Sequence, residues 1–457
     1  MYDVVVIGGG PGGYVAAIRG AQLGLSVAIV EKEQLGGTCL NWGCIPSKAL
    51  LKTSELVHSI KTCEAFGVKA DNLSVDFPAV IARSRRVVDK LVSGIAAILK
   101  SHNITVIQGT AKFKDAKTLD VDGKEVIGKN YIIATGAKAR LLPDVKLSKR
   151  IWTAKEAMNP GLEKVPERLL VIGSGAIGME FASFYHHMGS SVSVVELLDR
   201  ILPQEDTEIS TLAEKIFTKN GIKIRTKQSV IALKETDKSV QATFNDGSSE
   251  TFDAVLIAIG IVANSENLGL EKTKIQLNKG HIVINDKNQT AESHIFAIGD
   301  VVTPPWLAHK ASHEGVNVMD YIATGKSHSL GPIPSCTYCY PQIASVGLTE
   351  VQAKEKYGND VKVGRFSFMG NGKALTIGKE EGMIKLLFHA KTGELLGAHM
   401  IGAEVTDMIH SMTLAMTLES TEAEIMNTVF PHPTLSEMIH ESALDAFGQV
   451  LHMPKRK

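Results

Sequence analysis

A strand, a glycine-rich loop, a helix and a second strand follow one another twice in this chain, and this duplication limits the fold more than any other feature. In the first copy, apolar runs predict strands at residues 4–7 and 26–30, with a helix at residues 14–23 between them and Glu31 at the end. The loop matches G-x-G-x-x-G at Gly8, Gly10 and Gly13. This order, with an acid about 20 residues further on, is typical of a dinucleotide-binding unit.

Glycine suits such a loop for three physical reasons. The backbone must turn tightly, a pyrophosphate must approach the main chain, and the helix must pack closely on the strand. The helix N-terminus then binds the phosphates, and Glu31 binds a ribose hydroxyl. A purely structural glycine loop is the alternative, which the position of Glu31 disfavours.

The second copy has the same order of elements. Strands are predicted at residues 168–172 and 191–195, a helix at residues 179–187, and the acid is Glu196. The motif glycines are Gly173, Gly175 and Gly178. The carboxylate of Glu196 would repel a 2′-phosphate, which predicts NAD and not NADP on this unit.

The distance between the copies is constant. Gly8 and Gly173 are 165 residues apart, and so are Glu31 and Glu196. The chain therefore carries two equivalent dinucleotide sites, which favours electron transfer between two dinucleotides. Each unit closes with a strand and a glycine turn expected to face its nucleotide, at Thr135, Gly136 and Gly260.

A cysteine pair follows the first unit. Cys39 and Cys44 lie among three glycines and Pro46, which fits the first turn of a helix. Cys44 is then expected at a helix N-terminus, where the helix dipole and Lys48 on the same face favour a thiolate. We interpret the pair as a redox centre; a structural pair or half of a metal site are the alternatives.

Three further places are candidates. Asp300 follows an apolar strand at residues 295–298 and either binds the sugar-alcohol chain of a flavin or is a turn residue. His432 stands between two prolines, and Glu437 could orient it as a base, although a loop histidine is usually only solvated. Cys336 and Cys339 form a C-x-x-C pair, for which core or surface thiols are favoured over a redox pair or a zinc half-site.

Composition excludes several classes of function. Lys plus Arg and Asp plus Glu number 49 each, so no polyanionic partner such as nucleic acid is expected. No apolar stretch is long enough to span a membrane, and the first strand leaves no room for a targeting peptide. Five cysteines suit a reducing compartment. We expect a cytoplasmic protein, or a mitochondrial matrix protein whose transit peptide has been removed.

Taken together, the two units, the Cys-x4-Cys pair and the C-terminal His-Pro with a following Glu resemble the flavin-dependent pyridine nucleotide-disulfide oxidoreductases over essentially the whole chain. Residues 36–48, 195–203 and 432–437 are most similar to the dihydrolipoamide dehydrogenase branch of that family. Two departures are visible. Residues 261–264 replace a usual Arg or Pro-Asn, and Cys339-Tyr340-Pro341 stands where Thr-His-Pro is commoner.

The resemblance implies an α/β fold with two Rossmann-like domains and a C-terminal α+β dimerisation domain. The implied domains are an FAD-binding domain at 1–145, an NAD-binding domain at 146–270, a central domain completing the FAD site at 271–332, and an interface domain at 333–457. It further implies that Glu31 and Asp300 bind the ribose and ribityl hydroxyls of FAD and that NAD binds the second unit.

The resemblance also implies residue roles. Cys39 would exchange with lipoamide, Cys44 would pass electrons to FAD, and Lys48 would lie near the flavin, paired with Glu180. His432, oriented by Glu437, would deprotonate dihydrolipoamide. It would come from the other subunit of a homodimer. No metal is implied.

The implied partners are the lipoyl domains and E2 core of 2-oxo acid dehydrogenase complexes, or the H protein of glycine cleavage. Two other functions stay open. A related NAD(P)H-dependent reductase of the glutathione reductase type would prefer NADPH, which Glu196 disfavours. A non-catalytic flavoprotein assembly subunit would not need Cys39, Cys44 and His432.

Overall fold

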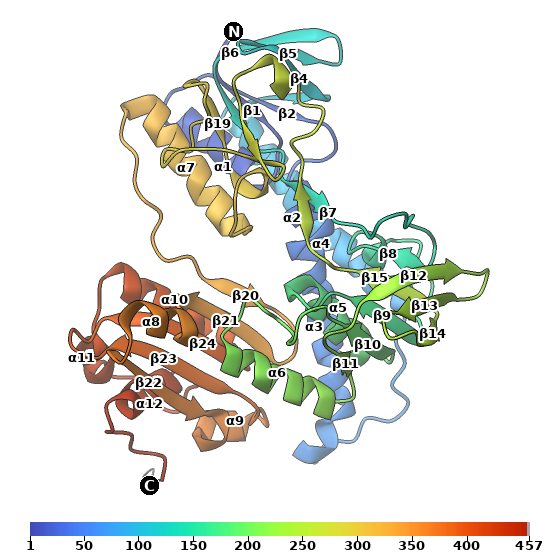
Figure 1. Ribbon diagram of the computed structural model, residues 1–457, viewed down its shortest axis with the longest axis vertical. Helices are drawn as coiled ribbons and strands as arrows, with labels where there is room; N and C mark the ends of the chain where they lie inside the picture. The colour runs from blue at the N-terminus through green and yellow to red at the C-terminus, as the bar shows by residue number, and fades with distance from the viewer. Residues whose placement is uncertain (455–457) are drawn as a thin grey trace.

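The computed structural model describes residues 1–454 and contains three main β-sheets. Figure 1 shows the first at the top of the view, the second at the right and the third at the lower left. The first two are the predicted Rossmann-like units, and the third belongs to a C-terminal α+β part. The predicted fold class is therefore confirmed.

The first sheet has the strand order β3-β2-β1-β6-β5-β4, and β19 pairs with β6. Its β1, β2, β3, β6 and β19 are parallel, whereas β4, β5 and β6 pair as antiparallel neighbours. Because β19 follows the whole second unit in the chain, two separate segments build the first nucleotide site. The strands are β1 (Tyr2–Ile7), β2 (Val27–Glu31), β3 (Thr105–Gln108), β4 (Ala111–Asp115), β5 (Thr118–Val121), β6 (Lys124–Ile133) and β19 (Ile295–Ala297).

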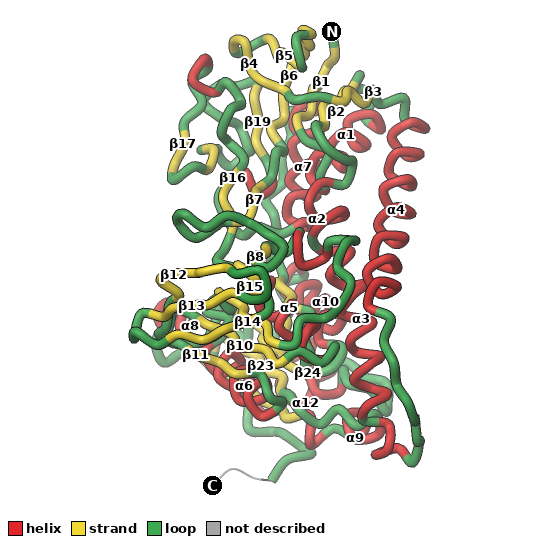
Figure 2. Tube along the Cα trace, turned by 90° about the vertical axis from the view of Figure 1, so that its right-hand side faces the viewer, coloured by secondary structure: helices red, strands yellow, loops and turns green. Residues whose placement is uncertain are grey.

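Helices from distant parts of the chain cover this sheet. The helices α1 (Pro11–Gln22) and α7 (Ala308–Thr324) pack closely because Gly315 has no Cβ. A Cβ there would lie only 2.6 Å from the carbonyl oxygen of Gly12. Helices α2 (Gly37–Trp42) and α3 (Cys44–Lys61) follow, and the long α4 (Phe77–Ser101) packs against α1, α2 and α3. Figure 2 shows α4 along one edge of the molecule.

The second sheet is entirely parallel, in the order β11-β10-β9-β15-β8, and a three-stranded sheet β12-β13-β14 lies beside it. A short ribbon of β7 (Ala137–Ala139) and β16 (Ile261–Ala263) links it to the first unit. The other elements are β8 (Ile151–Trp152), β9 (Arg168–Ile172), α5 (Ala176–His187), β10 (Ser191–Val195), α6 (Thr207–Lys219), β11 (Lys223–Arg225), β12 (Val230–Glu235), β13 (Val240–Phe244), β14 (Ser249–Phe252) and β15 (Ala254–Ile257).

Both nucleotide units differ from the sequence prediction in the same way. The helices α1 and α5 begin at Pro11 and Ala176, three residues before the predicted starts at 14 and 179. The sequence misplaced the starts because Gly12, Gly13 and Gly178 are poor helix formers. They nevertheless lie in the first turn, where the close packing of helix and strand requires them.

The third sheet is antiparallel, in the order β20-β21-β24-β23-β22. The sequence pattern of this part predicts strands at 383–388 and 395–400 and helices at 405–418 and 422–428, and the structure has all four within two residues of these bounds. Its elements are β20 (Ser335–Thr337), β21 (Gln342–Gly347), α8 (Glu350–Tyr357), β22 (Val361–Ser367), α9 (Gly372–Thr376), β23 (Met383–His389), β24 (Leu395–Gly402), α10 (Val405–Thr417), α11 (Glu422–Asn427) and α12 (Glu437–Ala446).

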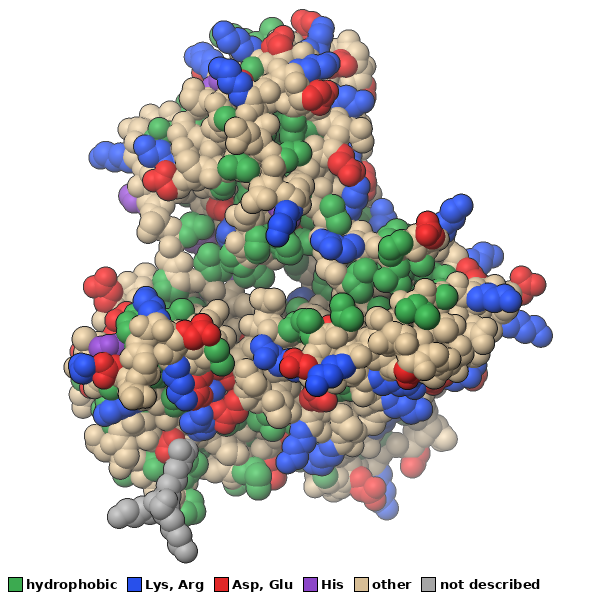
Figure 3. All heavy atoms as spheres, in the orientation of Figure 1, with side chains coloured by type: hydrophobic (Ala, Val, Ile, Leu, Met, Phe, Trp, Pro, Cys, Tyr) green, Lys and Arg blue, Asp and Glu red, His purple; other side chains and the backbone are tan. Residues whose placement is uncertain are grey.

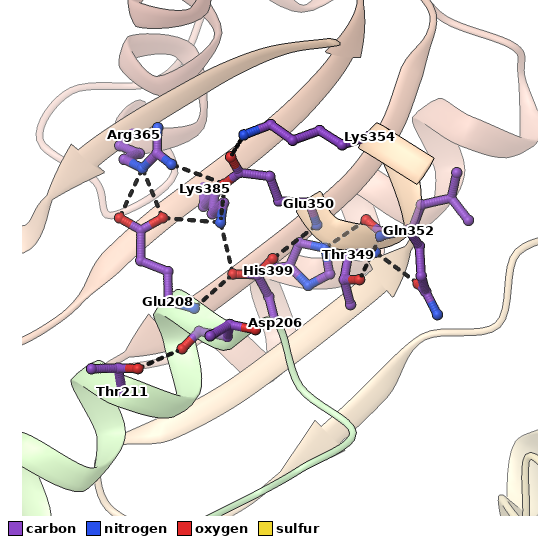
Figure 4. A network of polar contacts seen from close by, with 12 residues as sticks. Asp206, Glu208, Thr211, Thr349, Glu350, Gln352, Lys354, Arg365, Lys385 and His399 are labelled. Atoms are coloured by element: carbon purple, nitrogen blue, oxygen red, sulfur yellow. Dashed lines mark hydrogen bonds and ion pairs between the residues drawn. The ribbon is translucent and has the colours of Figure 1, made fainter. Parts of the chain in front are cut away.

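Charged side chains join the second and third parts. Lys385 of β23 contacts Asp206 and Glu208 at the start of α6 and Glu350 at the start of α8. Arg365 of β22 binds Glu208 and Glu350 from the other side (Figure 4). Among residues 1–454, no helix is both long and apolar enough to cross a membrane.

Candidate active site

Cys39 and Cys44 lie on two consecutive helices. The short α2 carries Cys39, Gly43 interrupts the backbone, and α3 begins at Cys44 with Pro46 in its first turn, as predicted. A Cβ on Gly43 would lie 3.0 Å from the carbonyl oxygen of Thr38. A side chain at this break would be crowded, and the break brings the two cysteines together. Both are free thiols in this structure.

The two thiols differ in acidity. A hydrogen bond between them lowers the pKa of Cys44 and raises the pKa of Cys39. Burial raises both values, and Lys48 lowers both. The sequence predicted that the helix terminus and Lys48 lower the pKa of Cys44, but the hydrogen bond from Cys39 lowers this pKa more. Cys44 is thus the group that ionises and Cys39 the group that stays protonated.

Lys48 is held by a carboxylate from the second unit. Its Nζ lies 2.9 and 3.0 Å from the two carboxylate oxygens of Glu180 on α5, the pairing that the resemblance implied. Glu180 is buried, whereas a third of the Lys48 side chain is exposed. The Tyr338 main-chain N–H, from the segment after β20, donates to the same carboxylate at 3.0 Å. All three main parts of the chain therefore meet beside Cys44.

The first glycine loop has the shape that a pyrophosphate requires. A Cβ on Gly8 would lie 2.4 Å from the carbonyl oxygen of Ala134, and one on Gly13 would lie 1.9 Å from that of Gly8. A Cβ on Gly10, in contrast, would meet no atom closer than 3.9 Å. No side chain caps the helix N-terminus there. The space over Gly10 leaves room for the pyrophosphate of the dinucleotide that the motif predicts.

The second loop repeats this geometry. A Cβ on Gly173 would lie 2.4 Å from the carbonyl oxygen of Ala258, and one on Gly178 would lie 2.0 Å from that of Gly173. A Cβ on Gly175 would meet nothing within 4 Å, and no side chain caps α5. The open space over Gly175 fits the pyrophosphate of NAD.

The two acids also occupy equivalent places. Glu31 accepts hydrogen bonds from the main-chain N–H groups of Gly9 and Glu33, each at 2.7 Å. Glu196 accepts from those of Ser174 and Leu198, each at 2.9 Å. Each carboxylate thus fixes its glycine loop and retains lone pairs for a ribose hydroxyl.

Strand ends complete the first site. Asp300 lies in a 3-10 turn after β19, and burial raises the pKa of its carboxyl group. Thr135 donates to the main-chain carbonyl of Asn264, and the Asn264 N–H donates to that of Gly136. Residues 261–264, which depart from the family pattern, therefore join the two units through β7 and β16. Gly260, just before them, has a positive φ of 107°.

His432 lies in the C-terminal part, away from the cysteines of its own chain. Its Nδ1 is 2.8 Å from a carboxylate oxygen of Glu437, the first residue of α12. Burial raises the pKa of Glu437. The Thr434 N–H and His432 together lower it by more, so the net shift of the pKa is downward. The His432 side chain is 78% exposed, and among the described residues it contacts neither cysteine.

The C-x-x-C pair flanks Tyr338, which contacts Glu180. Cys339 is buried and Cys336 partly so, and both are free thiols. Within residues 1–454, no group of three or more His, Cys, Asp or Glu side chains is placed to hold a metal. Sequence reasoning missed Tyr338, since a main-chain contact to Glu180 across 158 positions leaves no local signal.

Figure 3 shows the surface hollowed between the upper part of the molecule and the two lower parts, with hydrophobic side chains gathered there. Most of the chain matches a known family. Residues 2–315 match the family model of pyridine nucleotide-disulphide oxidoreductases, and residues 333–443 match the dimerisation domain of the same family.

Relatives and solved structures agree with these matches. The chain is 49% identical to a dihydrolipoyl dehydrogenase of Zymomonas mobilis and 45% identical to one of Bacillus subtilis, with 99% of both chains covered in each case. It is also similar to the structure of LpdA from Mycobacterium tuberculosis, with a TM-score of 0.90, 26% identity and coverage of 96% and 98%. The flavoprotein disulfide reductase RclA from Escherichia coli has a TM-score of 0.88, 27% identity and coverage of 97% and 99%.

Proposed function

Because the chain belongs to the pyridine nucleotide-disulphide oxidoreductase family, we propose that its Cys39 and Cys44 are the redox pair through which dihydrolipoamide is oxidised. The chain is an FAD- and NAD-dependent oxidoreductase with dihydrolipoyl dehydrogenase activity. The observation that carries the assignment of the pair is their contact at the start of α3, where Cys39 favours ionisation of Cys44.

The thiol chemistry follows from the different acidities of the pair. In the oxidised enzyme, a substrate thiolate attacks the Cys39 sulfur and breaks the Cys39–Cys44 bond, and Cys44 leaves as the thiolate. The second substrate thiol then attacks the substrate sulfur of the mixed disulfide, which forms lipoamide and releases Cys39. A low pKa makes Cys44 the better leaving group, in keeping with this order of events.

His432 is the proposed base for the substrate thiol. Glu437 holds the Nδ1 side of the ring, so the opposite nitrogen is free to accept a proton. Because His432 contacts neither cysteine of its own chain, we assign it to the site of the partner subunit. The family dimerisation domain at residues 333–443 supports a homodimer.

The glycine loops and acids hold the cofactors in this proposal. FAD supplies the acceptor for the electron pair of the dithiol, and NAD supplies the final hydride acceptor. Gly8, Gly10, Gly13 and Glu31 position the first cofactor, together with Asp300 and Thr135 to Gly136. The second is positioned by Gly173, Gly175, Gly178, Glu196 and Gly260. Lys48, fixed by Glu180, would supply a positive charge beside the pair and near the first cofactor.

We further propose that the substrate dithiol is carried by lipoyl domains bound to an E2 core, or by the H protein of glycine cleavage. Since Cys63, Cys336 and Cys339 are free thiols, a reducing compartment such as the bacterial cytoplasm suits the chain. We also propose that the four domains end at residues 145, 270, 332 and 457.

The test is NADH formation from dihydrolipoamide and NAD by the purified flavoprotein, beside NADP and a glutathione reductase assay. We expect rapid turnover only with dihydrolipoamide and NAD, because Glu196 repels a 2′-phosphate. Cys44→Ser should abolish turnover and keep FAD bound, with Cys63→Ser as the control. Near-normal turnover of the Cys44 variant would remove the pair from the mechanism, and preference for NADPH and glutathione would favour the sister reductase.

A further inference from the structure

The segment after β20 contacts the Lys48 and Glu180 pair twice. The Lys48 Nζ lies 4.4 Å from the centroid of the Tyr338 ring, within the range of a cation–π interaction. The Tyr338 N–H donates to the Glu180 carboxylate at 3.0 Å. One residue of the C-terminal part thus contacts the cation through its ring and the anion through its backbone.

A second hydrogen bond fixes this segment on α5. The Tyr340 N–H donates to the Ser183 hydroxyl at 3.0 Å, one helical turn beyond Glu180. The segment therefore follows α5 with two main-chain contacts, and the Tyr338 ring has little freedom to leave Lys48.

The position of Lys48 matters because two opposite charges act on Cys44. Lys48 lowers the pKa of Cys44, and Glu180 raises it. Cys39 on α2 donates to the same thiol, and Tyr14 on α1 is the other titratable side chain that faces it. With a third of its side chain exposed, Lys48 could swing into solvent if Glu180 alone held it.

We propose that Tyr338 is a positioning residue for the redox pair: its ring and main-chain N–H hold Lys48 and Glu180 in the arrangement in which Lys48 acts on the Cys44 thiolate. The proposal deepens the proposed function, because it assumes that Cys44 is the thiolate of the pair. It assigns to the C-terminal part a role beside the redox pair of its own chain, in addition to dimerisation and to the role proposed for His432.

The test measures the acidity of Cys44 directly in the FAD-bound protein. In a Cys39→Ser background, Cys44 cannot form the disulfide, and the serine hydroxyl can still donate to it. The rate at which iodoacetamide alkylates Cys44 is then followed against pH, with the modified peptide identified by mass spectrometry. This separates Cys44 from Cys63, Cys336 and Cys339.

Tyr338→Leu and Tyr338→Met remove the ring face, whereas Tyr338→Phe keeps it and is the matched control. We expect the leucine and methionine variants to raise the midpoint of the alkylation profile by about half a pKa unit or more relative to phenylalanine. Either variant alone suffices if the other fails to fold, and Tyr338 is exposed enough, at 37%, to tolerate both.

Profiles that coincide with that of the phenylalanine variant, or that shift to lower pH, would overturn the proposal. A loss of thermal stability without a shifted profile would do the same, because it would show a merely structural role. The dihydrolipoamide assay of the unmodified enzyme is independent of this outcome. Failure of that assay would instead count against the proposed function.

Discussion

The Lys385 ammonium lies 2.7 Å from the Asp206 carboxylate, and both side chains are only 1% exposed (Figure 4). The two residues are 179 positions apart and belong to different parts of the chain. Glu208 and Glu350 contact the same ammonium at 2.9 and 2.7 Å. One buried cation therefore binds three carboxylates. Glu208 and Glu350 are also bound by Arg365, and Glu350 by Lys354, whereas Lys385 is the only cation paired with Asp206 among the described residues.

Lys385→Met should destabilise the protein markedly, because it leaves the buried Asp206 carboxylate without its cation. Removal of one partner from a buried pair costs about 3–5 kcal/mol. The measurement is the free energy of unfolding by urea. Lys391→Met is the control, since Lys391 forms a comparable pair with Asp360 but is 72% exposed, and should change stability by less than about 1 kcal/mol. Equal effects of the two substitutions would contradict the buried network.

The two glycine positions of the NAD loop should respond in opposite ways. Gly178→Ala places a Cβ 2.0 Å from the carbonyl oxygen of Gly173 and should destabilise the fold by about 1–3 kcal/mol. Gly175→Ala meets open space at a φ of −67° and should change stability by less than about 1 kcal/mol. It should nevertheless weaken NADH binding at least about tenfold, because the methyl group occupies the pyrophosphate position.

Calorimetric titration of NADH into each variant separates the two effects. Gly10→Ala is the matched control, since it changes the corresponding position of the other loop and should leave NADH binding unaltered. Undiminished NADH affinity of the Gly175 variant would show that the nucleotide lies elsewhere.

Patterns local in the sequence predicted most of this architecture. The glycines, strands and acids of both units follow from a few neighbouring residues, so residues 168–172 and 191–195 were predicted with their observed bounds. Helix starts were misplaced because packing overrides the low helix propensity of Gly12 and Gly178. Contacts such as those of Lys385 and Tyr338 join residues more than 150 positions apart. No periodicity marks them, because they depend on how the completed parts pack together.

His187 should make the protein sensitive to acid. Its pKa is lowered to about 3, mainly by burial and to a lesser extent by positive charge at His58, His186, Lys61 and Lys379. The unfolded chain binds a proton near pH 6.5 and the folded one near pH 3, so stability is present above about pH 6.5 and is lost as the pH falls. This single group should cost about 2 kcal/mol between pH 7 and pH 5.

His187→Leu should remove most of that loss, leaving the share of His58 and His186, whose pKa values are also lowered by burial. Urea unfolding at pH 7 and at pH 5 measures this loss of stability. The exposed His328→Gln serves as the control and should keep the acid sensitivity of the unmodified protein. An unchanged pH dependence in the leucine variant would mean that His187 is protonated in the folded state at pH 5, as it is in the unfolded chain.

The separation of His432 from the cysteines leads to a test of site sharing. His432→Gln alone should slow dihydrolipoamide oxidation by at least about 10²-fold, as loss of a general base does, and Cys44→Ser alone should abolish it. In a heterodimer of the two variants, one site carries both substitutions and the other carries neither, provided that each site takes its histidine from the partner. Co-expression with two different tags allows this heterodimer to be purified.

The purified heterodimer should recover about half the activity of the unmodified dimer, because one of its two symmetric sites is intact. A heterodimer of Cys39→Ser and Cys44→Ser is the control and should stay inactive, since each of its sites then lacks one cysteine. If the histidine and the cysteines of one chain worked together, every site of the first heterodimer would carry one lesion. Its activity would then stay near the residual rate of the His432 variant, and the assignment of His432 to the partner's site would be wrong.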